Sequence, residues 1–375
     1  RKAGGLSTSF LLSSARGNRK PVMKMFLRGK AMIPRTGDLL DIMRDVLTST
    51  RFDNRERFRQ MVLEEKARLE QRLVPAGHQL VDLRIRRRFN ESDRVAEEMG
   101  GISYLFFIRK LAGKVDRRWS SVLAVLRDMS RLLVQRRTML FNVTVDQEGW
   151  RTVEPEIHRF VGHIPEGDAT RRVWRYRRPS GNEGIIVPSQ VNYVGKGADL
   201  YSLGFRYRGS TGVITRYIRN SWLWDRVRVQ GGAYGAFCTF DRLSGVLAFL
   251  SYRDPNVFRT INIFDETAQF LKKEKLSREE VTKAIIGTIG DMDGYQFPDA
   301  RGYASMVRFL AGISESERQR IRDEVLATTA EDFQSFADVL NEAALSGQVA
   351  VMGSEKALRD AEAEGGLGLE LLKVL

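Results

Sequence analysis

The sequence predicts an α+β fold built from two units of similar organisation. In each unit, strand-like segments come first and amphipathic segments of helical periodicity follow. Between them, residues 165–184 read PEGDATRRVWRYRRPSGNEG, and this content of Pro, Gly and charge is typical of a linker. We therefore place the first unit at 1–165, the linker at 166–185 and the second unit at 186–375. No short-period repeat is present, and the shared order of elements is that of a duplicated fold.

The first unit begins with two segments of strand character, residues 6–13 and 22–29, joined by a turn that reads RGNRKP. Apolar residues at helical spacing then predict a series of helices. We expect helices at about 38–49, 55–73, 78–99, 103–112 and 118–136, a strand at 139–145 and a short helix at 154–164.

The second unit opens with a predicted strand at 184–197, in which Pro188 indicates a sheet edge or a strand start. A helix is expected at 213–226. A β-hairpin follows, with arms at 229–240 and 246–252 and the turn DRLSG between them.

Capping signals predict the remaining helices. The expected starts are Asp254-Pro255 for a helix to about 273, Ser277 with Glu280 for a helix to about 290, Ser314 with Glu317, Thr328 with Glu331, and Ser354 for the last helix. Residues 348–353, QVAVMG, predict a buried strand between the last two helices.

Composition indicates a globular chain. Hydrophobic residues make up 42% and charged residues 29%, and no apolar run approaches the roughly 20 residues of a membrane helix. The chain begins at Arg1, so we expect a processed product or a piece of something longer, with no targeting segment visible. The single cysteine, Cys238, excludes an intrachain disulfide, fits a reducing compartment and is interpreted as a small buried hydrophobe.

The positive charge of the chain is confined to its first part. Residues 1–150 carry 31 basic and 17 acidic residues, which accounts for the whole net charge of +14, whereas 151–375 carry 30 of each. A basic half raises nucleic acid or an acidic protein surface as a partner. The tightest basic run, RIRRR at 84–88, lacks the interleaved aromatic residues of a base-stacking platform. Elsewhere acidic residues alternate with the basic ones, which is typical of solvated helix faces.

Most catalytic motifs are absent. The histidines are His78, His158 and His163, and the last two are five apart, which places them on different faces of a helix. Neither HExxH nor HxxEH occurs, and a lone cysteine excludes a Cys-based zinc site, so we predict no metal site in this chain. The nucleophile elbow GxSxG and the phosphate-binding loop GxxxxGK[ST] are also missing, and no histidine is placed beside Cys238.

One stretch combines reactive side chains with glycines: VRVQGGAYGAFCTFD, residues 227–241. On a regular strand Arg228 and Tyr234, six apart, would project from one face, and a bulge at Gly231-Gly232 would re-aim them. Either way the glycines would let another backbone come close. Both side chains donate hydrogen bonds suited to a carbonyl oxygen or a developing oxyanion. The alternative is an arginine paired with Asp225 or Asp254 beside a tyrosine packed at the sheet edge.

The residues around Arg228 and Tyr234 resemble those of a known protein family. The stretch 221–241 and the segments SGVLAFLSYRDPN (244–256) and KAIIGTIGDMDGYQFPDARGY (283–303) resemble the presequence protease group of the pitrilysin-like zinc metallopeptidases, which is subfamily C of peptidase family M16. The similarity extends to STSFLLSSARGNRKPVMKMFLRGKAM (7–32), EEMGGISYL (97–105) and VAVMGS (349–354), and covers nearly the whole chain.

The resemblance implies a two-half protease that closes around a peptide-sized chamber. Each half has two α+β domains. The N-terminal half carries HxxEH and zinc, and the C-terminal half supplies an arginine and a tyrosine that reach the bound peptide. This chain looks like that C-terminal half, with catalytic roles at Arg228 and Tyr234 and substrate-binding roles at Gly231 and Gly232. It is expected to be inactive alone. The implied partners are the catalytic half and short unstructured peptides, such as cleaved targeting presequences, with no nucleic acid and no membrane, in the mitochondrial matrix, the plastid stroma or both.

The resemblance also implies that the first unit is incomplete. The first unit looks like a third pitrilysin-like domain without its first strand and helix, which predicts an unpaired sheet edge and an exposed apolar face. The basic surplus is expected outside the chamber or against an acidic catalytic half. Residues 290–303, GDMDGYQFPDARGY, fit either a loop that orders the chamber wall or a turn between two helices. Competing hypotheses are a non-catalytic structural subunit of the same fold and a basic nucleic-acid-binding protein.

Overall fold

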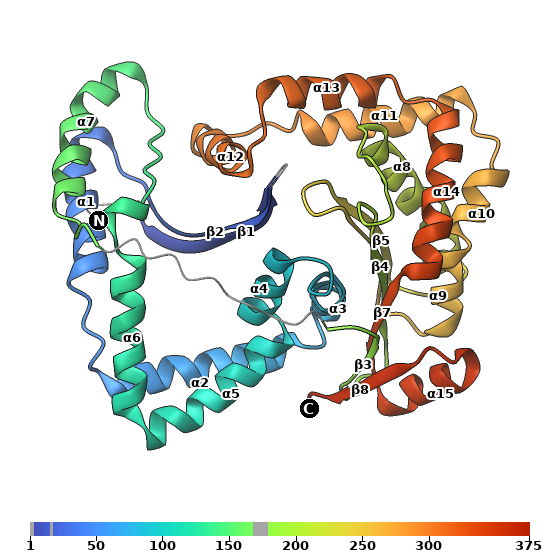
Figure 1. Ribbon diagram of the computed structural model, residues 1–375, viewed down its shortest axis with the longest axis horizontal. Coiled ribbons are helices and arrows are strands. Elements are labelled where there is room, and N and C mark those ends of the chain that lie inside the picture. The colour runs from blue at the N-terminus through green and yellow to red at the C-terminus, as the bar shows by residue number, and fades with distance from the viewer. Residues whose placement is uncertain (1–3, 16–17, 168–178) are drawn as a thin grey trace.

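The structure is a computed structural model that describes residues 4–15, 18–167 and 179–375 (Figure 1). The strands are β1 (Leu6–Ala15), β2 (Asn18–Gly29), β3 (Asn182–Ile186), β4 (Tyr193–Asp199), β5 (Gly235–Asp241), β6 (Val246–Tyr252), β7 (Gln348–Gly353) and β8 (Leu369–Lys373). The first seven α-helices are α1 (Thr36–Thr48), α2 (Arg55–Arg72), α3 (Gly77–Arg86), α4 (Glu91–Gly100), α5 (Ile102–Arg117), α6 (Trp119–Leu133) and α7 (Gln147–Gly162). The later ones are α8 (Ser210–Ile218), α9 (Phe258–Asp265), α10 (Thr267–Lys273), α11 (Arg278–Met292), α12 (Pro298–Ala311), α13 (Glu315–Leu326), α14 (Ala330–Ser346) and α15 (Glu355–Gly365). Short 3-10 helices lie at Ile33–Arg35 and Arg136–Thr138, and a π-helix at Arg219–Val229.

The main sheet has six strands in the order β5-β6-β4-β7-β3-β8. Strand β3 runs parallel to both of its neighbours, and the other adjacent pairs are antiparallel. The predicted α+β class, with a mixed sheet packed against helices, is confirmed.

Both faces of this sheet are buried, each in a different core. Along β7, Val349 and Val351 belong to one core, while Ala350 and Met352 belong to the other, as the alternation of a strand requires. The first core lies against α8, α9, α10 and α14, on the right in Figure 1. The second lies against α3 and α5, which come from the first part of the chain.

Helix α3 packs directly on the sheet because β4 is rich in glycine. A Cβ added at Gly195 would lie 2.5 Å from Cγ1 of Val81, and one at Gly197 would lie 2.7 Å from Cγ2 of Ile85. Val81 and Ile85 are completely buried. The helices of the first part and the sheet of the second part therefore share one core.

The basic run 84–88 is part of this contact. Nε of Arg84 donates to Glu183 at 2.7 Å and its Nη1 donates to Glu97 at 3.1 Å, with all three side chains almost fully buried. Burial lowers the pKa of Arg88 to about 10, an effect that Glu183 partly opposes. Burial alone would raise the pKa of Glu183, but the arginines hold it below its usual value. Several arginines of the run are thus engaged in ion pairs within the protein.

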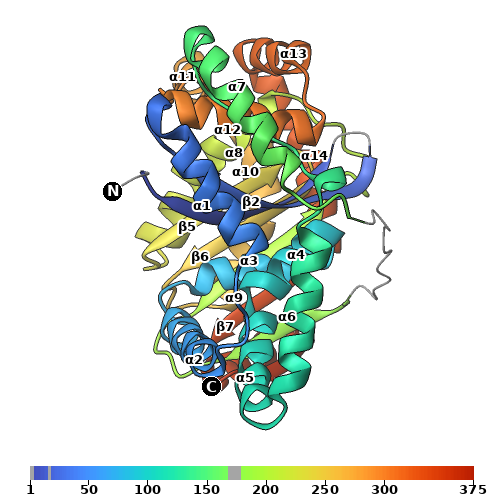
Figure 2. The same ribbon diagram turned by 90° about the vertical axis from the view of Figure 1, so that its left-hand side faces the viewer.

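The hairpin β1–β2 forms a separate two-stranded sheet, with Phe10 opposite Met25 and Leu12 opposite Met23. Phe10 is 53% exposed, and Met23 and Met25 are also exposed. Among the described residues no third strand joins this sheet, so the expected unpaired edge and exposed apolar face are present. Figure 2 shows the hairpin behind α1, which lies beside α7.

The segment 290–303 joins α11 to α12. Residues 293–297 connect the two helices, and Tyr295 is 84% exposed. The ring of Tyr303, on α12, lies 5.6 Å from that of Phe26 in an edge-on contact. The interpretation as a turn between two helices is correct; the proposed role in a chamber wall stays a prediction.

Several predicted elements differ from the structure. Residues 139–145 are extended near Met139 but form no strand, because no neighbouring strand pairs with them within the described residues. The predicted strand 184–197 is two strands, β3 and β4, separated in the sheet by β7. Helix α14 is capped by Thr329 with Asp332, one residue after the predicted pair. In the predicted linker, 168–178 lie outside the described residues, and β3 already begins at Asn182.

The helix predicted to start at Asp254 begins four residues later, at Phe258. The capping predictions at Ser277, Ser314 and Ser354 are confirmed. None of the helices within the described ranges combines the length and the apolar content that crossing a bilayer requires.

Candidate functional site

Arg228 lies at the end of a helix and not on a strand. Helix α8 continues into the π-helix Arg219–Val229, in which the backbone N–H of Gln230 donates to the carbonyl of Asp225, five residues earlier, at 2.9 Å. The predicted strand at 229–240 is wrong over its first six residues, because β5 begins only at Gly235. Wide helical turns of this kind are rare and occur frequently at functional sites.

The glycine pair ends this helix. Gly232 has φ +81°, its N–H donates to the carbonyl of Arg228 at 3.0 Å, and the N–H of Ala233 donates to Val227 at 3.1 Å. Helices commonly end at a glycine with positive φ, where N–H groups beyond the helix donate to its last carbonyl oxygens. A Cβ at Gly231 would lie 2.5 Å from the carbonyl oxygen of Val227. Gly231 is buried, whereas Gly232 is exposed, and only Gly232 contributes to the pocket described below.

Tyr234 sits in the turn between this helix and β5. Its N–H donates to the carbonyl of Tyr252 at 3.0 Å, and the two rings meet edge-on with centroids 5.7 Å apart. The side chain is 67% exposed. Within the described residues its hydroxyl has no hydrogen-bond partner, so it is available to a ligand.

Arg228 is half-buried and stacked on an indole. Its Cζ lies 3.9 Å from the ring centroid of Trp224, one helical turn earlier. The interpretation that pairs Arg228 with Asp225 or Asp254 is wrong. Asp225 accepts a hydrogen bond from Gln230 at 2.7 Å, and Asp254 is buried, with its carboxylate accepting from Thr260 at 2.8 Å.

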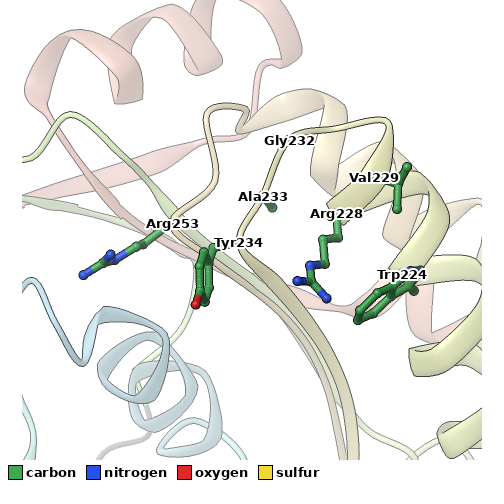
Figure 3. A pocket seen from close by; sticks show the side chains of 7 residues that line it. All are labelled: Trp224, Arg228, Val229, Gly232, Ala233, Tyr234 and Arg253. Carbon is green, nitrogen blue, oxygen red and sulfur yellow. The ribbon is translucent and has the colours of Figure 1, made fainter.

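These side chains line one open pocket of about 540 Å³ (Figure 3). Figure 3 shows Tyr234 between Arg228 and Arg253. The lining residues are Trp224, Arg228, Val229, Gly232, Ala233, Tyr234 and Arg253. None of them is acidic, so the wall presents two guanidinium groups and a phenol to whatever enters. Such donors bind carbonyl and carboxylate oxygens.

Four lining residues were not predicted as site residues: Trp224, Val229, Ala233 and Arg253. Of these, Trp224 and Arg253 bear on binding. Trp224 precedes Arg228 by four residues, a spacing that would have placed them together had the helix been extended to Val229. Arg253 follows β6 directly, and no pattern in the sequence marks it as a site residue.

Zinc has no fitting site here. In the part of the chain that the structure describes, no three His, Cys, Asp or Glu side chains are grouped so that they could hold a metal ion. His78 on α3 is stacked on Phe237 at 5.5 Å, and burial lowers its pKa. His158 and His163 lie on and just after α7, where Nδ1 of His163 is 2.7 Å from the carbonyl oxygen of Arg159.

Cys238 lies on β5 and is buried in the core between the sheet and α8, as predicted. Burial raises the pKa of its thiol far above the usual range. A thiol that stays protonated is a poor nucleophile.

Two family models match the chain. One describes a region associated with subfamily C of peptidase family M16 and matches residues 1–111. The other, described as PreP C-terminal domain, matches residues 182–355. The second match contains the whole pocket.

Curated relatives match over most of the chain. It is 42% identical over 376 residues to Presequence protease 1, chloroplastic/mitochondrial, from Arabidopsis thaliana, and the alignment covers 100% of this chain and 35% of that protein. It is 24% identical to the mitochondrial presequence protease of Xenopus laevis, over 80% of this chain and 32% of that protein. The chain thus spans about a third of the length of these relatives.

Solved structures share the fold. A peptidase M16 inactive domain from Pseudomonas fluorescens superimposes with a TM-score of 0.58 at 13% identity, covering 92% of this chain and 81% of that one. Pitrilysin superimposes with a TM-score of 0.54 at 13% identity, over 99% of this chain and 38% of that one.

Proposed function

Since the chain belongs to the presequence proteases, subfamily C of peptidase family M16, and corresponds to their C-terminal region, we propose that it is the substrate-clamping half of an organellar zinc metalloendopeptidase. Its substrates are short unstructured peptides, including cleaved targeting presequences. Zinc and the general base belong to a separate, N-terminal half, with which this chain encloses the peptide. A mitochondrial matrix or plastid stroma location is proposed from the printed name of the Arabidopsis relative.

The proposal depends on one observation: Arg228 and Tyr234 line an open pocket, and neither side chain has an acidic or hydrogen-bonding partner among the described residues. No described carboxylate lies within 4.0 Å of the Arg228 guanidinium group, and the phenol of Tyr234 has no acceptor. Donors without internal partners can form hydrogen bonds to a peptide carbonyl oxygen without first breaking other hydrogen bonds.

In the proposed mechanism these residues hold the peptide and stabilise charge. Arg228, held against Trp224, donates to a backbone carbonyl of the bound peptide. Tyr234 donates its hydroxyl proton in a hydrogen bond to the oxygen of the scissile carbonyl, where negative charge develops as water attacks. Gly232, which carries no side chain, lets the peptide backbone approach the pocket wall. The zinc-bound half supplies the attacking water and its activation.

A structural subunit of the same fold would need no such pocket. Two cationic side chains without an acidic partner and a phenol without an acceptor among the described residues add little to the packing of the fold, but they are suited to binding. This arrangement favours the clamp over the structural role. Arg84 and Arg88 are buried, so the tightest basic run of the basic first part does not form a phosphate-binding surface cluster, which counts against the nucleic-acid hypothesis.

Replacement of the tyrosine hydroxyl tests the proposal. In the full-length protease, Tyr234→Phe is expected to lower kcat about 10²–10³-fold, the usual effect of losing one donor to a developing oxyanion, with KM little changed. Tyr207→Phe is the matched control, because Tyr207 does not line the pocket and its ring is stacked on Phe240. Equal turnover of Tyr234→Phe and the wild type would remove the proposed role.

A further inference from the structure

We propose that Arg253 is a substrate-binding residue that takes a carboxylate of the peptide, an inference that rests on the clamping function proposed above. The carboxylate is either the C-terminus of the peptide or an Asp or Glu side chain close to the bond that is cut. Arg253 lines the same pocket as Arg228 and Tyr234. It lies on the other side of Tyr234 from Arg228 (Figure 3).

The backbone of Arg253 is strained. Its φ is +49°, and it is the one non-glycine residue with positive φ among the described residues. The left-handed region is unfavourable for an arginine, because its Cβ comes too close to the following carbonyl oxygen. Strain of this kind persists where the surrounding structure imposes it, and it gathers at binding and catalytic sites.

The neighbouring residues impose this conformation. Asp254 and Asn192 exchange two backbone hydrogen bonds of 2.8 Å, and the carboxylate of Asp254 accepts from the N–H of Asn256 at 2.9 Å. On the other side, the carbonyl of Arg253 lies 3.3 Å from the N–H of Tyr234. Arg253 is thus fixed between the end of β6 and a buried aspartate, and its side chain is directed to the surface.

The guanidinium group of Arg253 has an aromatic support but no counter-charge. Its Cζ lies 5.4 Å from the ring centroid of Tyr252. Burial raises the pKa of the adjacent Tyr193, and the charge of Arg253 and a side-chain hydrogen bond between the two residues offset part of this rise. The carboxylate nearest in sequence, that of Asp254, is turned inward to Thr260. No ion pair of Arg253 exists within the described residues.

Closure of the proposed chamber makes a carboxylate the fitting ligand. Two guanidinium groups without an acidic neighbour are stable in open solvent, but enclosing them in a less polar space is costly unless an anion enters with them. A backbone carbonyl carries no net charge and satisfies one donor. A carboxylate compensates the charge and accepts two parallel hydrogen bonds from the guanidinium fork. Arg228, already stacked on Trp224, suits the carbonyl, and Arg253 suits the carboxylate.

The test compares paired peptides with the full-length protease and its Arg253→Gln variant. The two peptides of the first pair have the same sequence, one with a free C-terminal carboxylate and the other with a C-terminal amide. A second pair, both amidated, carries Glu or Gln near the cleaved bond. For the wild type we expect kcat/KM to be about tenfold higher for the acidic member of at least one pair, mainly through KM. Arg253→Gln is expected to abolish this preference, and Arg253→Lys to restore part of it. The pair that shows the effect identifies the source of the carboxylate.

Two controls separate the possible outcomes. Arg259→Gln removes another exposed arginine, on α9, and should keep the preference. Tyr234→Phe tests the clamping function itself, and unchanged turnover in this variant overturns that function. The preference of Arg253→Gln for acidic peptides tests the carboxylate-binding role of Arg253. Our inference is overturned if the wild type shows no preference in either pair, if Arg253→Gln retains it, or if Arg253→Gln lowers kcat/KM equally for both members of each pair.

Discussion

At the residue scale, the partners of a charged side chain distinguish a binding role from a packing role. Arg84 and Arg88 of the 84–88 run are buried beside Glu183 of β3, whereas Arg228 and Arg253 are supported by aromatic rings and have no acidic partner among the described residues. Both environments satisfy an arginine, but only the second leaves its charge without an acidic partner among the described residues. Charge composition alone cannot separate the two cases, since the same residue type occurs in both.

Asp82 on α3 gives the clearest dependence on pH. Burial raises its pKa to about 6, an effect that Arg86 opposes and Asp93 and Asp241 add to, and one of its carboxylate oxygens is buried without a partner in the described residues. The folded state therefore binds the Asp82 proton more tightly than the unfolded state does. The contribution of Asp82 to stability is present at low pH and is lost as pH rises from about 4 through about 6.

We accordingly expect Asp82→Asn to stabilise the protein at pH 8 by on the order of 2–3 kcal/mol, since each pKa unit corresponds to about 1.4 kcal/mol. The gain should vanish well below pH 3.8, where Asp82 is protonated in both states. Urea unfolding across this range measures it. Asp360→Asn, at an exposed position on α15, is the control and should show no such trend. A stability difference that does not vary with pH would refute the assignment.

At the element scale, the position of the π-helix decides the geometry of the pocket. The helix places Trp224 and Arg228 one turn apart. Gly232 then reverses the chain, so that Tyr234, just before β5, lies beside them. The glycines act at a helix end. The place of Gly232 in the pocket wall is a consequence of this turn and did not require a bulged strand.

Gly232→Ala separates backbone strain from crowding. A Cβ at Gly232 would meet only Cγ of Pro255, at 3.5 Å, so its cost comes from φ +81° and should be about 1–2 kcal/mol of unfolding free energy. Gly231→Ala should cost more, because its Cβ would lie 2.5 Å from the carbonyl oxygen of Val227. Denaturant unfolding of both variants provides the comparison. Wild-type stability in Gly232→Ala would show that the left-handed turn is not required.

Local signals in the sequence predicted local structure well. The capping box of Ser277 with Glu280 and the caps at Ser314 and Ser354 are present, because a cap depends on residues within one turn. Residues 348–353 form the buried strand that their apolar run indicates. Predictions that depended on distant partners were less accurate.

Two segments illustrate that limit. Residues 139–145 alternate like a strand but find no partner strand in the described structure, and a strand exists only when it is paired. Residues 229–234 read as a strand because Val227, Val229 and the glycines fit both a hairpin arm and a helix end. Arg228 and Tyr234 were singled out by their spacing and residue types, and their catalytic role came from the family resemblance, whereas Trp224 and Arg253 required the coordinates.

At the scale of the whole molecule, the first part of the chain and the six-stranded sheet form one continuous core. Helix α3 lies on the glycines of β4, and the buried contact of Arg84 with Glu97 and Glu183 joins α3, α4 and β3. This core fixes β6 and the turn after it, and therefore Arg253. The pocket lies at the β5 end of the sheet, and all its lining residues belong to the second part of the chain.

The most direct test of the central claim is a structure of the full-length protease, inactivated in its zinc-binding half, with a peptide bound. The measurement is the distance from the Tyr234 hydroxyl and the Arg228 guanidinium group to the nearest peptide carbonyl oxygens. We predict hydrogen bonds of about 2.7–3.2 Å from both groups, with the peptide facing the metal on its other side. A bound peptide that leaves both groups in solvent would contradict the account.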